Sequence, residues 1–160
     1  MITWNNLRAM RTKMSLLLVA AVCLSPTPLL AHHGQSVAFD TSNTWSTWAT
    51  VENFSYQNPH PALLFTRKVK DGTEEHWVAE VFNNPARLAR IGWSKARSLD
   101  ALKPGTRVKL FLATARVGGF NAYVGRMENE KGEPILSDAA PPPGTVDLDG
   151  APGGYQPKAR

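Results

Sequence analysis

Cysteine is nearly absent from this chain of 160 residues, in which Cys23 is the single example. It lies in an apolar run, residues 14–24, so everything after that run lacks a thiol. This absence excludes a disulfide framework, an iron–sulfur cluster and a cysteine nucleophile from the rest of the chain. The length fits one domain of ordinary size.

Acidic residues are missing from the start of the chain. All thirteen follow the apolar run, whereas Arg8, Arg11 and Lys13 precede it. The net charge of +5 therefore falls to about +2 beyond the run, with fifteen basic residues against thirteen acidic ones. So small a surplus argues against a nucleic-acid partner.

The first thirty-one residues have the order of a secretory signal peptide. A basic stretch precedes the apolar run, and residues 25–31, "SPTPLLA", add helix-breaking prolines and end on a small residue. The run is too short to span a membrane. We expect cleavage after Ala31, with cleavage after Ala38 as the alternative, and export to the periplasm or beyond as a chain without a transmembrane span.

Composition divides the chain into three segments. Residues 1–31 are the predicted signal peptide and residues 32–137 the predicted folded domain. Residues 138–160 are rich in proline and glycine and have almost no large aliphatic side chains. Such a segment cannot bury enough apolar surface to order itself, so we predict a disordered tail.

Alternation of apolar and polar residues predicts an all-β domain of five or six strands. The strands are expected within residues 44–58, 61–69, 75–82, 102–115, 121–128 and 132–136. One short helix is expected after the third strand, with Asn84 as its cap, Pro85 at its first position and Gly92 as its stop. This order favours a small barrel of the oligonucleotide/oligosaccharide-binding (OB) type, because closure removes sheet edges; an open sandwich is the alternative.

Several stretches resemble one family of secreted bacterial proteins, known as domain of unknown function 6152. They are "AHHGQSVAFD", "NPHPALLF", "HWVAEVFNNPARLARIGW", "LKPGTRVKL" and "KGEPI", which together cover most of residues 32–136. The resemblance implies periplasmic export and an OB-like barrel. It implies no particular activity.

Histidines provide the sharpest chemical hypothesis. If cleavage follows Ala31, His32 carries a free α-amine beside its imidazole, and the two together can chelate Cu(II), which favours tetragonal nitrogen ligation. His33 and His60 are the candidates for a further imidazole, together with His76. His60 lies between two prolines, which fix the backbone around it. The alternatives are a solvated terminal arm for His33, a turn residue for His60 and a surface residue for His76.

Aromatic residues provide a second hypothesis. Trp48, Phe54 and Tyr56 lie in or next to the first strand, and OB barrels stack bases or sugars on aromatics of their open face. Core packing is the alternative role for such residues. In an exported protein, a glycan or a partner protein is a better expectation than nucleic acid.

Motifs of conventional enzymes are not found. There is no Walker loop, no dinucleotide fingerprint and no His-x-x-x-His pair, and "GWSKA" lacks the final glycine of a nucleophile elbow. Glu75 and Glu80 are five apart on one strand and so face opposite sides. We therefore expect catalysis only if it depends on a metal, and predict a binding or accessory module.

The module has two predicted forms. In the first, the mature N-terminus binds copper through His32, with His33 or His60. In the second, a metal-free barrel binds a partner protein, a glycan or another small ligand, as a subunit of a periplasmic or membrane-bound complex.

Overall fold

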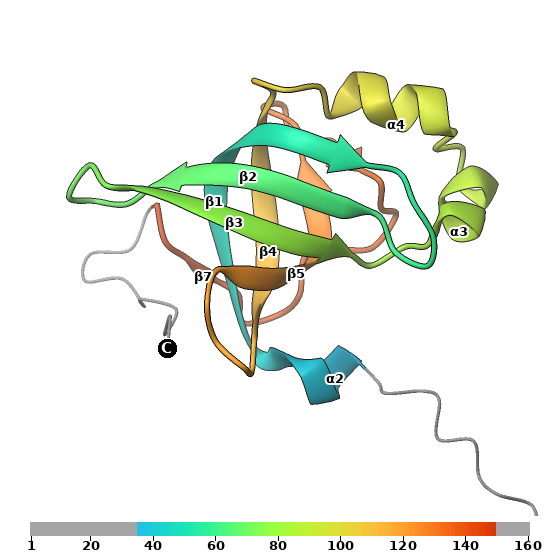
Figure 1. Ribbon diagram of the computed structural model, residues 1–160. Helices are drawn as coiled ribbons and strands as arrows, with labels where there is room; N and C mark the ends of the chain where they lie inside the picture. The colour runs from blue at the N-terminus through green and yellow to red at the C-terminus, as the bar shows by residue number, and fades with distance from the viewer. Residues whose placement is uncertain (1–34, 150–160) are drawn as a thin grey trace, which may run out of the picture. The chain divides into compact units, whose positions relative to one another are not determined.

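Five strands close into a barrel in the computed structural model, which describes residues 35–149. The strands pair in the order β2-β3-β5-β4-β1, and β1 pairs with β2 to close the ring (Figure 1). Only β3 and β5 run parallel within this ring. The five strands are β1 Phe39–Ser55, β2 Ala62–Lys68, β3 Glu74–Val81, β4 Arg107–Ala115 and β5 Asn121–Glu128. The OB-like prediction is confirmed, and the pairing of β1 with β2 rules out the open sandwich.

β1 takes part in two antiparallel pairings because it is long and bent. Its residues from Thr44 to Thr50 pair with β4, and those from Thr50 to Ser55 pair with β2. A bulge at Glu52 separates the two parts of the β2 register. An extra residue bends the strand and increases its twist, which allows one strand to turn the corner of a small barrel.

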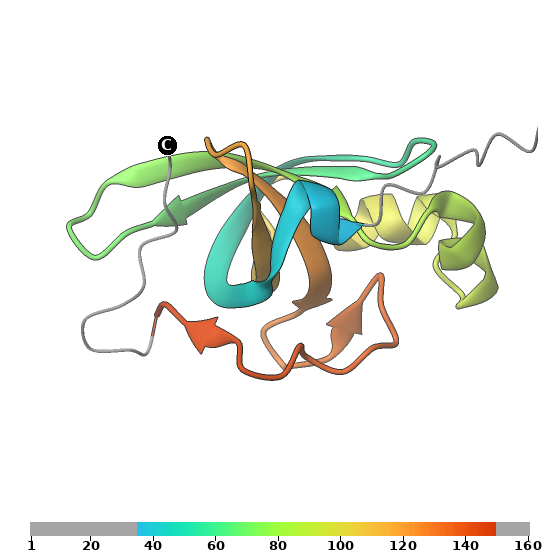
Figure 2. The same cartoon turned by 90° about the horizontal axis from the view of Figure 1, so that it is seen from below.

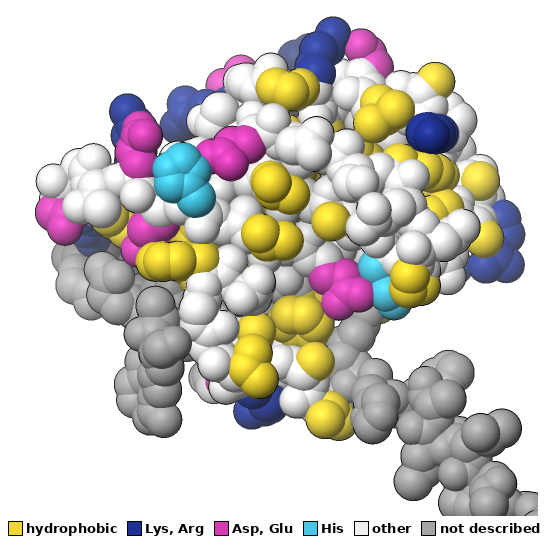
Figure 3. Space-filling view, viewed as in Figure 1, with side chains coloured by type: hydrophobic (Ala, Val, Ile, Leu, Met, Phe, Trp, Pro, Cys, Tyr) yellow, Lys and Arg dark blue, Asp and Glu magenta, His cyan; other side chains and the backbone are white. Residues whose placement is uncertain are grey.

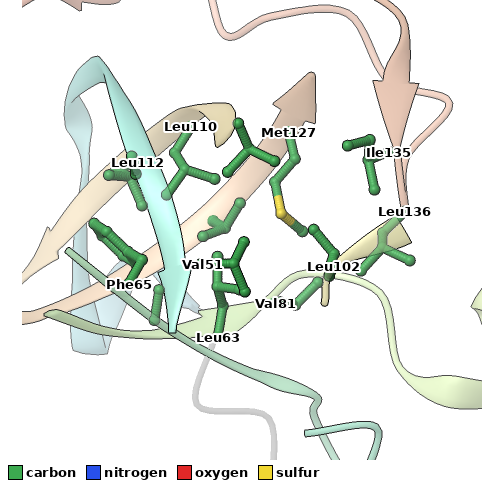
Figure 4. Close-up of a cluster of buried hydrophobic side chains, with 14 of the residues drawn as sticks. Val51, Leu63, Phe65, Val81, Leu102, Leu110, Leu112, Met127, Ile135 and Leu136 are labelled. Atoms are coloured by element: carbon green, nitrogen blue, oxygen red, sulfur yellow. The ribbon is translucent and has the colours of Figure 1, made fainter. Parts of the chain in front are cut away.

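The barrel encloses a core of side chains from all five strands, and Figure 4 shows them converging. Trp77 is one of its buried side chains, stacked on Phe65 with 6.4 Å between ring centroids and edge-on to Trp45 at 5.3 Å. The Trp77 face of β3 is therefore the buried one, and His76 on the opposite face is exposed.

A charged pair is enclosed beside this aromatic core. The Arg67 side chain is only 4% exposed, and its Nε lies 2.6 Å from Glu75 Oε2. The same carboxylate oxygen accepts a hydrogen bond from Trp77 Nε1 at 2.9 Å. The register of β2 and β3 places Arg67 directly opposite Glu75, so one carboxylate satisfies both buried donors.

Two helices connect β3 to β4, where one was expected. The expected helix is α3, Pro85–Arg90, with the Asn84 side chain capping it and Gly92 in the left-handed conformation after it. The second is α4, Lys95–Ala101, capped by Ser94. Our prediction of a single helix was wrong because Ser98 is the only buried residue of α4, so no apolar stripe marks it in the sequence. A further short helix, α2 Gln35–Ala38, precedes β1.

The C-terminal segment departs from our prediction of a disordered tail beginning at residue 138. After the short strand β6, Pro134–Ile135, residues 138–149 form a strap along the barrel that includes β7, Val146–Asp147 (Figure 2). β7 pairs in parallel with β1, and Leu148 is buried. Polar contacts and one buried leucine order the strap. Its proline- and glycine-rich composition therefore did not indicate that these residues would be ordered. Residues 150–160 lie outside the described range, as does the predicted signal peptide.

None of the helices within residues 35–149 has the length and apolar character needed to cross a membrane.

Candidate ligand-binding site

A hollow of about 570 Å³ opens on the outer surface of the barrel, and we call it the Trp48 hollow. Strands β1, β2, β3 and β4 and the end of the strap all contribute to it. Its lining residues are Trp48, Ala49, Thr50, Thr66, Lys68, Glu74, Arg107 and Asp149.

Trp48 and Arg107 form one wall of the hollow. Trp48 and Thr50 share a face of β1 because they are two residues apart, and Arg107 on β4 lies opposite Thr50. The Arg107 guanidinium carbon is 4.8 Å from the Trp48 ring centroid, a cation–π distance. Within residues 35–149, no ion pair and no hydrogen bond involves the Arg107 guanidinium. The half-buried Trp48 indole therefore contacts the exposed Arg107 guanidinium, whose N–H donors have no hydrogen-bond partner among residues 35–149.

The strap forms a second wall through Asp149. Its carboxylate accepts hydrogen bonds from the Trp48 backbone N–H at 2.7 Å and from Thr47 Oγ1 at 3.0 Å. Lys109 Nζ lies 2.8 Å from Asp149 and 2.7 Å from Asp147. Burial raises the pKa of Asp147, but hydrogen bonding and the charge of Lys109 outweigh it and leave that pKa below its ordinary value.

The opposite side of the hollow consists of polar residues of β2 and β3. Lys68 Nζ lies 3.4 Å from Glu74 Oε1. The Thr66 hydroxyl donates to Glu52, which also accepts a hydrogen bond from His76 Nδ1. These two hydrogen bonds, that of Thr66 first, lower the pKa of Glu52. A hydroxyl and an ion pair therefore face the indole across the hollow.

The predicted copper ligands are only partly placed. His60, between β1 and β2, has Nε2 at 3.5 Å from Glu80 Oε1, while its Nδ1 is buried without a hydrogen-bond partner. His32 and His33 lie outside the described residues. Among residues 35–149, no three side chains of the His, Cys, Asp and Glu types are grouped to hold a metal ion. The histidine side chains drawn in Figure 3 lie at two separate places, each beside acidic side chains.

The structure does not bring the three predicted stacking residues together on one exposed surface. Trp48 lines the hollow. Phe54 is buried in the core, and the half-buried Tyr56 donates its hydroxyl to the Pro85 carbonyl oxygen at 3.1 Å. Phe54 and Tyr56 therefore have the packing role that was the alternative.

Sequence reasoning missed Arg107 and Asp149. Arg107 lies within a predicted strand, but its position beside Trp48 depends on the register between β1 and β4. Asp149 lay in the segment expected to be disordered. Neither had a local signal that could have revealed its role.

Comparison with known proteins identifies a family. The profile of the family of unknown function DUF6152 matches residues 20–122, a range that includes Trp48, His60 and Arg107 but not the strap. No curated protein and no solved structure matches the chain. The match extends over more than half of the sequence and from the predicted signal peptide into β5. The chain therefore belongs to the family of unknown function DUF6152.

Proposed function

We propose that this protein is an exported binding module that holds a glycan in the Trp48 hollow. The observation that carries the proposal is a half-buried indole set in the wall of an open hollow and surrounded by hydroxyl, carboxylate and cationic groups. Sugar rings offer an apolar face to an aromatic platform and hydroxyls to polar neighbours. Ligand sites in proteins combine such an apolar surface with a few convergent polar groups.

Three further features favour a glycan. OB barrels bind oligosaccharides as well as oligonucleotides. The predicted signal peptide directs the chain to the periplasm or beyond, where glycans are abundant. The two carboxylates of the hollow, those of Glu74 and Asp149, are each paired with a lysine, which suits binding better than proton transfer.

Replacing Trp48 by alanine is expected to weaken glycan binding by about tenfold to a hundredfold, taking as a guide the roughly 1–3 kcal/mol lost when an aromatic platform for a nucleobase is removed. The measurement is isothermal titration of the purified exported protein with neutral and acidic oligosaccharides. Phe82→Ala is the matched control, since Phe82 is also an exposed aromatic but does not line the hollow. Equal affinities for the two variants, or no binding of any oligosaccharide by the unchanged protein, would contradict the proposal.

A second candidate function is copper binding by the mature N-terminus, through the amine and imidazole of His32 with His60 or His33. The environment of His60 favours it. One ring nitrogen has no hydrogen-bond partner, and the other lies 3.5 Å from the Glu80 carboxylate. Carboxylates beside histidines commonly orient the ring at metal sites.

The copper proposal predicts a mature chain that begins at His32 and binds one equivalent of Cu(II). Intact mass of the exported protein tests the first part, and a chain beginning at Phe39 would end the proposal. Electron paramagnetic resonance during Cu(II) titration tests the second. We expect His32→Ala to lose the nitrogen-ligated signal and His76→Ala, the control, to keep it; an unchanged signal in His32→Ala would refute copper binding at this position.

A further inference from the structure

We infer that the ligand of the Trp48 hollow is an acidic, extended glycan, one of whose oxyanion groups binds to Arg107. This inference rests on the proposed function, because it specifies the chemistry of a ligand for the same hollow. Two independent observations carry it: the unused donors of Arg107, and a second hollow that shares this residue.

Arg107 is the cation of the Trp48 hollow that the fold leaves unpaired. Lys68 is paired with Glu74, and the neighbouring Lys109 is held between Asp147 and Asp149. The Arg107 guanidinium has no such partner within residues 35–149 and lies over the Trp48 ring. Its planar donors match the geometry of a carboxylate or phosphate, and the cation–π contact with Trp48 restrains the side chain before the ligand arrives.

A second hollow of about 400 Å³ adjoins the first at Arg107. It is formed by the approach to β4 and by the turn between β5 and β6. Its lining residues are Gly105, Thr106, Arg107, Asn129, Glu130 and Lys131. A ligand that engages Arg107 therefore has room on both sides of the guanidinium. A single sugar unit cannot occupy both hollows, whereas an oligosaccharide can lie along them.

The charges along the two hollows favour an acidic glycan over a single-stranded nucleic acid. A nucleic acid carries one phosphate per nucleotide and needs a continuous row of free cations. Here Lys68 is paired, so Arg107 and Lys131 are the lining cations without an ion pair among residues 35–149, and Glu74, Asp149 and Glu130 line the hollows with them. A ligand with few oxyanions, bound near Arg107 and the neighbouring Lys131, and uncharged hydroxyls elsewhere fits this pattern.

Titration of the purified exported protein with matched ligands tests the inference. The ligands are an oligouronate, a phosphate-bearing oligosaccharide and a neutral oligosaccharide of equal length, and the uronate monosaccharide. We expect an acidic oligosaccharide to bind at least about tenfold more tightly than the neutral oligosaccharide. The uronate monosaccharide should bind more weakly than the oligouronate. The comparison of the uronate with the phosphate identifies which oxyanion is preferred.

Arg107 variants give the second arm. Arg107→Ala is expected to lower affinity for the acidic oligosaccharide to that for the neutral one, and Arg107→Lys to recover only part of it, because an ammonium lacks the planar fork. Arg97→Ala is the matched control: Arg97 stacks on Trp93 at 4.1 Å and lines neither hollow. It should leave both affinities unchanged.

The outcomes separate this inference from the proposed function. If the unchanged protein binds acidic and neutral oligosaccharides equally, and Arg107→Ala has no effect, the acidic ligand is refuted while a glycan site at Trp48 stands. If the monosaccharide binds as tightly as the oligosaccharide, the extended ligand is refuted. If single-stranded DNA of the same length binds more tightly than any glycan, the ligand class is wrong. If Trp48→Ala leaves the affinity for every ligand unchanged, the proposed function itself is refuted.

Discussion

Replacing Glu75 by alanine is expected to lower the free energy of unfolding by about 3–5 kcal/mol, as observed when one partner of a buried ion pair is removed. The substitution leaves the Arg67 guanidinium, 4% exposed, without its carboxylate at 2.6 Å. It also deprives the buried Trp77 indole N–H of its acceptor. Urea denaturation measures this loss, and the m value is expected to stay unchanged.

Two comparisons isolate the buried pair. Glu74→Ala removes the neighbouring ion pair with Lys68, whose side chains are 76% and 52% exposed, and is expected to cost no more than about 1 kcal/mol. A double variant, Arg67→Met with Glu75→Met, removes both charges and should recover much of the loss. A Glu75→Ala protein as stable as the Glu74→Ala protein would show that the pair is not enclosed as described.

Truncation after Ser137 is expected to lower the free energy of unfolding by about 2–4 kcal/mol. Exposure of the Leu148 site costs about 1.5–3 kcal/mol. Loss of Asp147 and Asp149 leaves Lys109, whose side chain is 12% exposed, without its carboxylates, at a further cost of about 1–3 kcal/mol. The truncated protein no longer incurs the entropic cost of ordering residues 138–149, which offsets part of both.

Truncation after Asp149 is the control for the strap, because it retains every contact described for residues 138–149. Thermal and urea unfolding of the two truncated proteins measure the difference. Adding Lys109→Met to the shorter protein removes the unpaired cation and should restore part of its stability. Equal stability of the two truncated proteins would mean that the strap contributes nothing to the fold, and would support the original prediction of a disordered tail.

Local patterns predicted most of the barrel strands. Strand β5 begins and ends where alternation placed it, at Asn121 and Glu128, and the N-cap of α3 and the glycine that follows the helix were predicted from single residues, Asn84 and Gly92. These features depend on neighbours in the chain, such as a side chain capping a free N–H three residues away. Helix α4 was missed because almost none of it is buried, so its sequence contains no apolar period.

The candidate site was predictable only in part. Trp48 was identified from its type and its place in a strand rich in aromatics, but Phe54 and Tyr56 were grouped with it although they pack inward or hydrogen-bond to the backbone. Whether an aromatic in an irregular, bulged strand faces the core depends on the register after the bulge. That register is set by the partner strand rather than by the aromatic itself.

By itself, the sequence determined the order of the strands along the chain, helix α3 and the family, because each is encoded in residues close together or in a shared pattern. The tertiary structure decided what surrounds Trp48. Arg107 reaches it through pairing of β4 with β1, and Asp149 through a strap whose order comes from Lys109 and Leu148 rather than from its own composition. Contacts between segments far apart in sequence depend on closure of the barrel, and no local periodicity reports them.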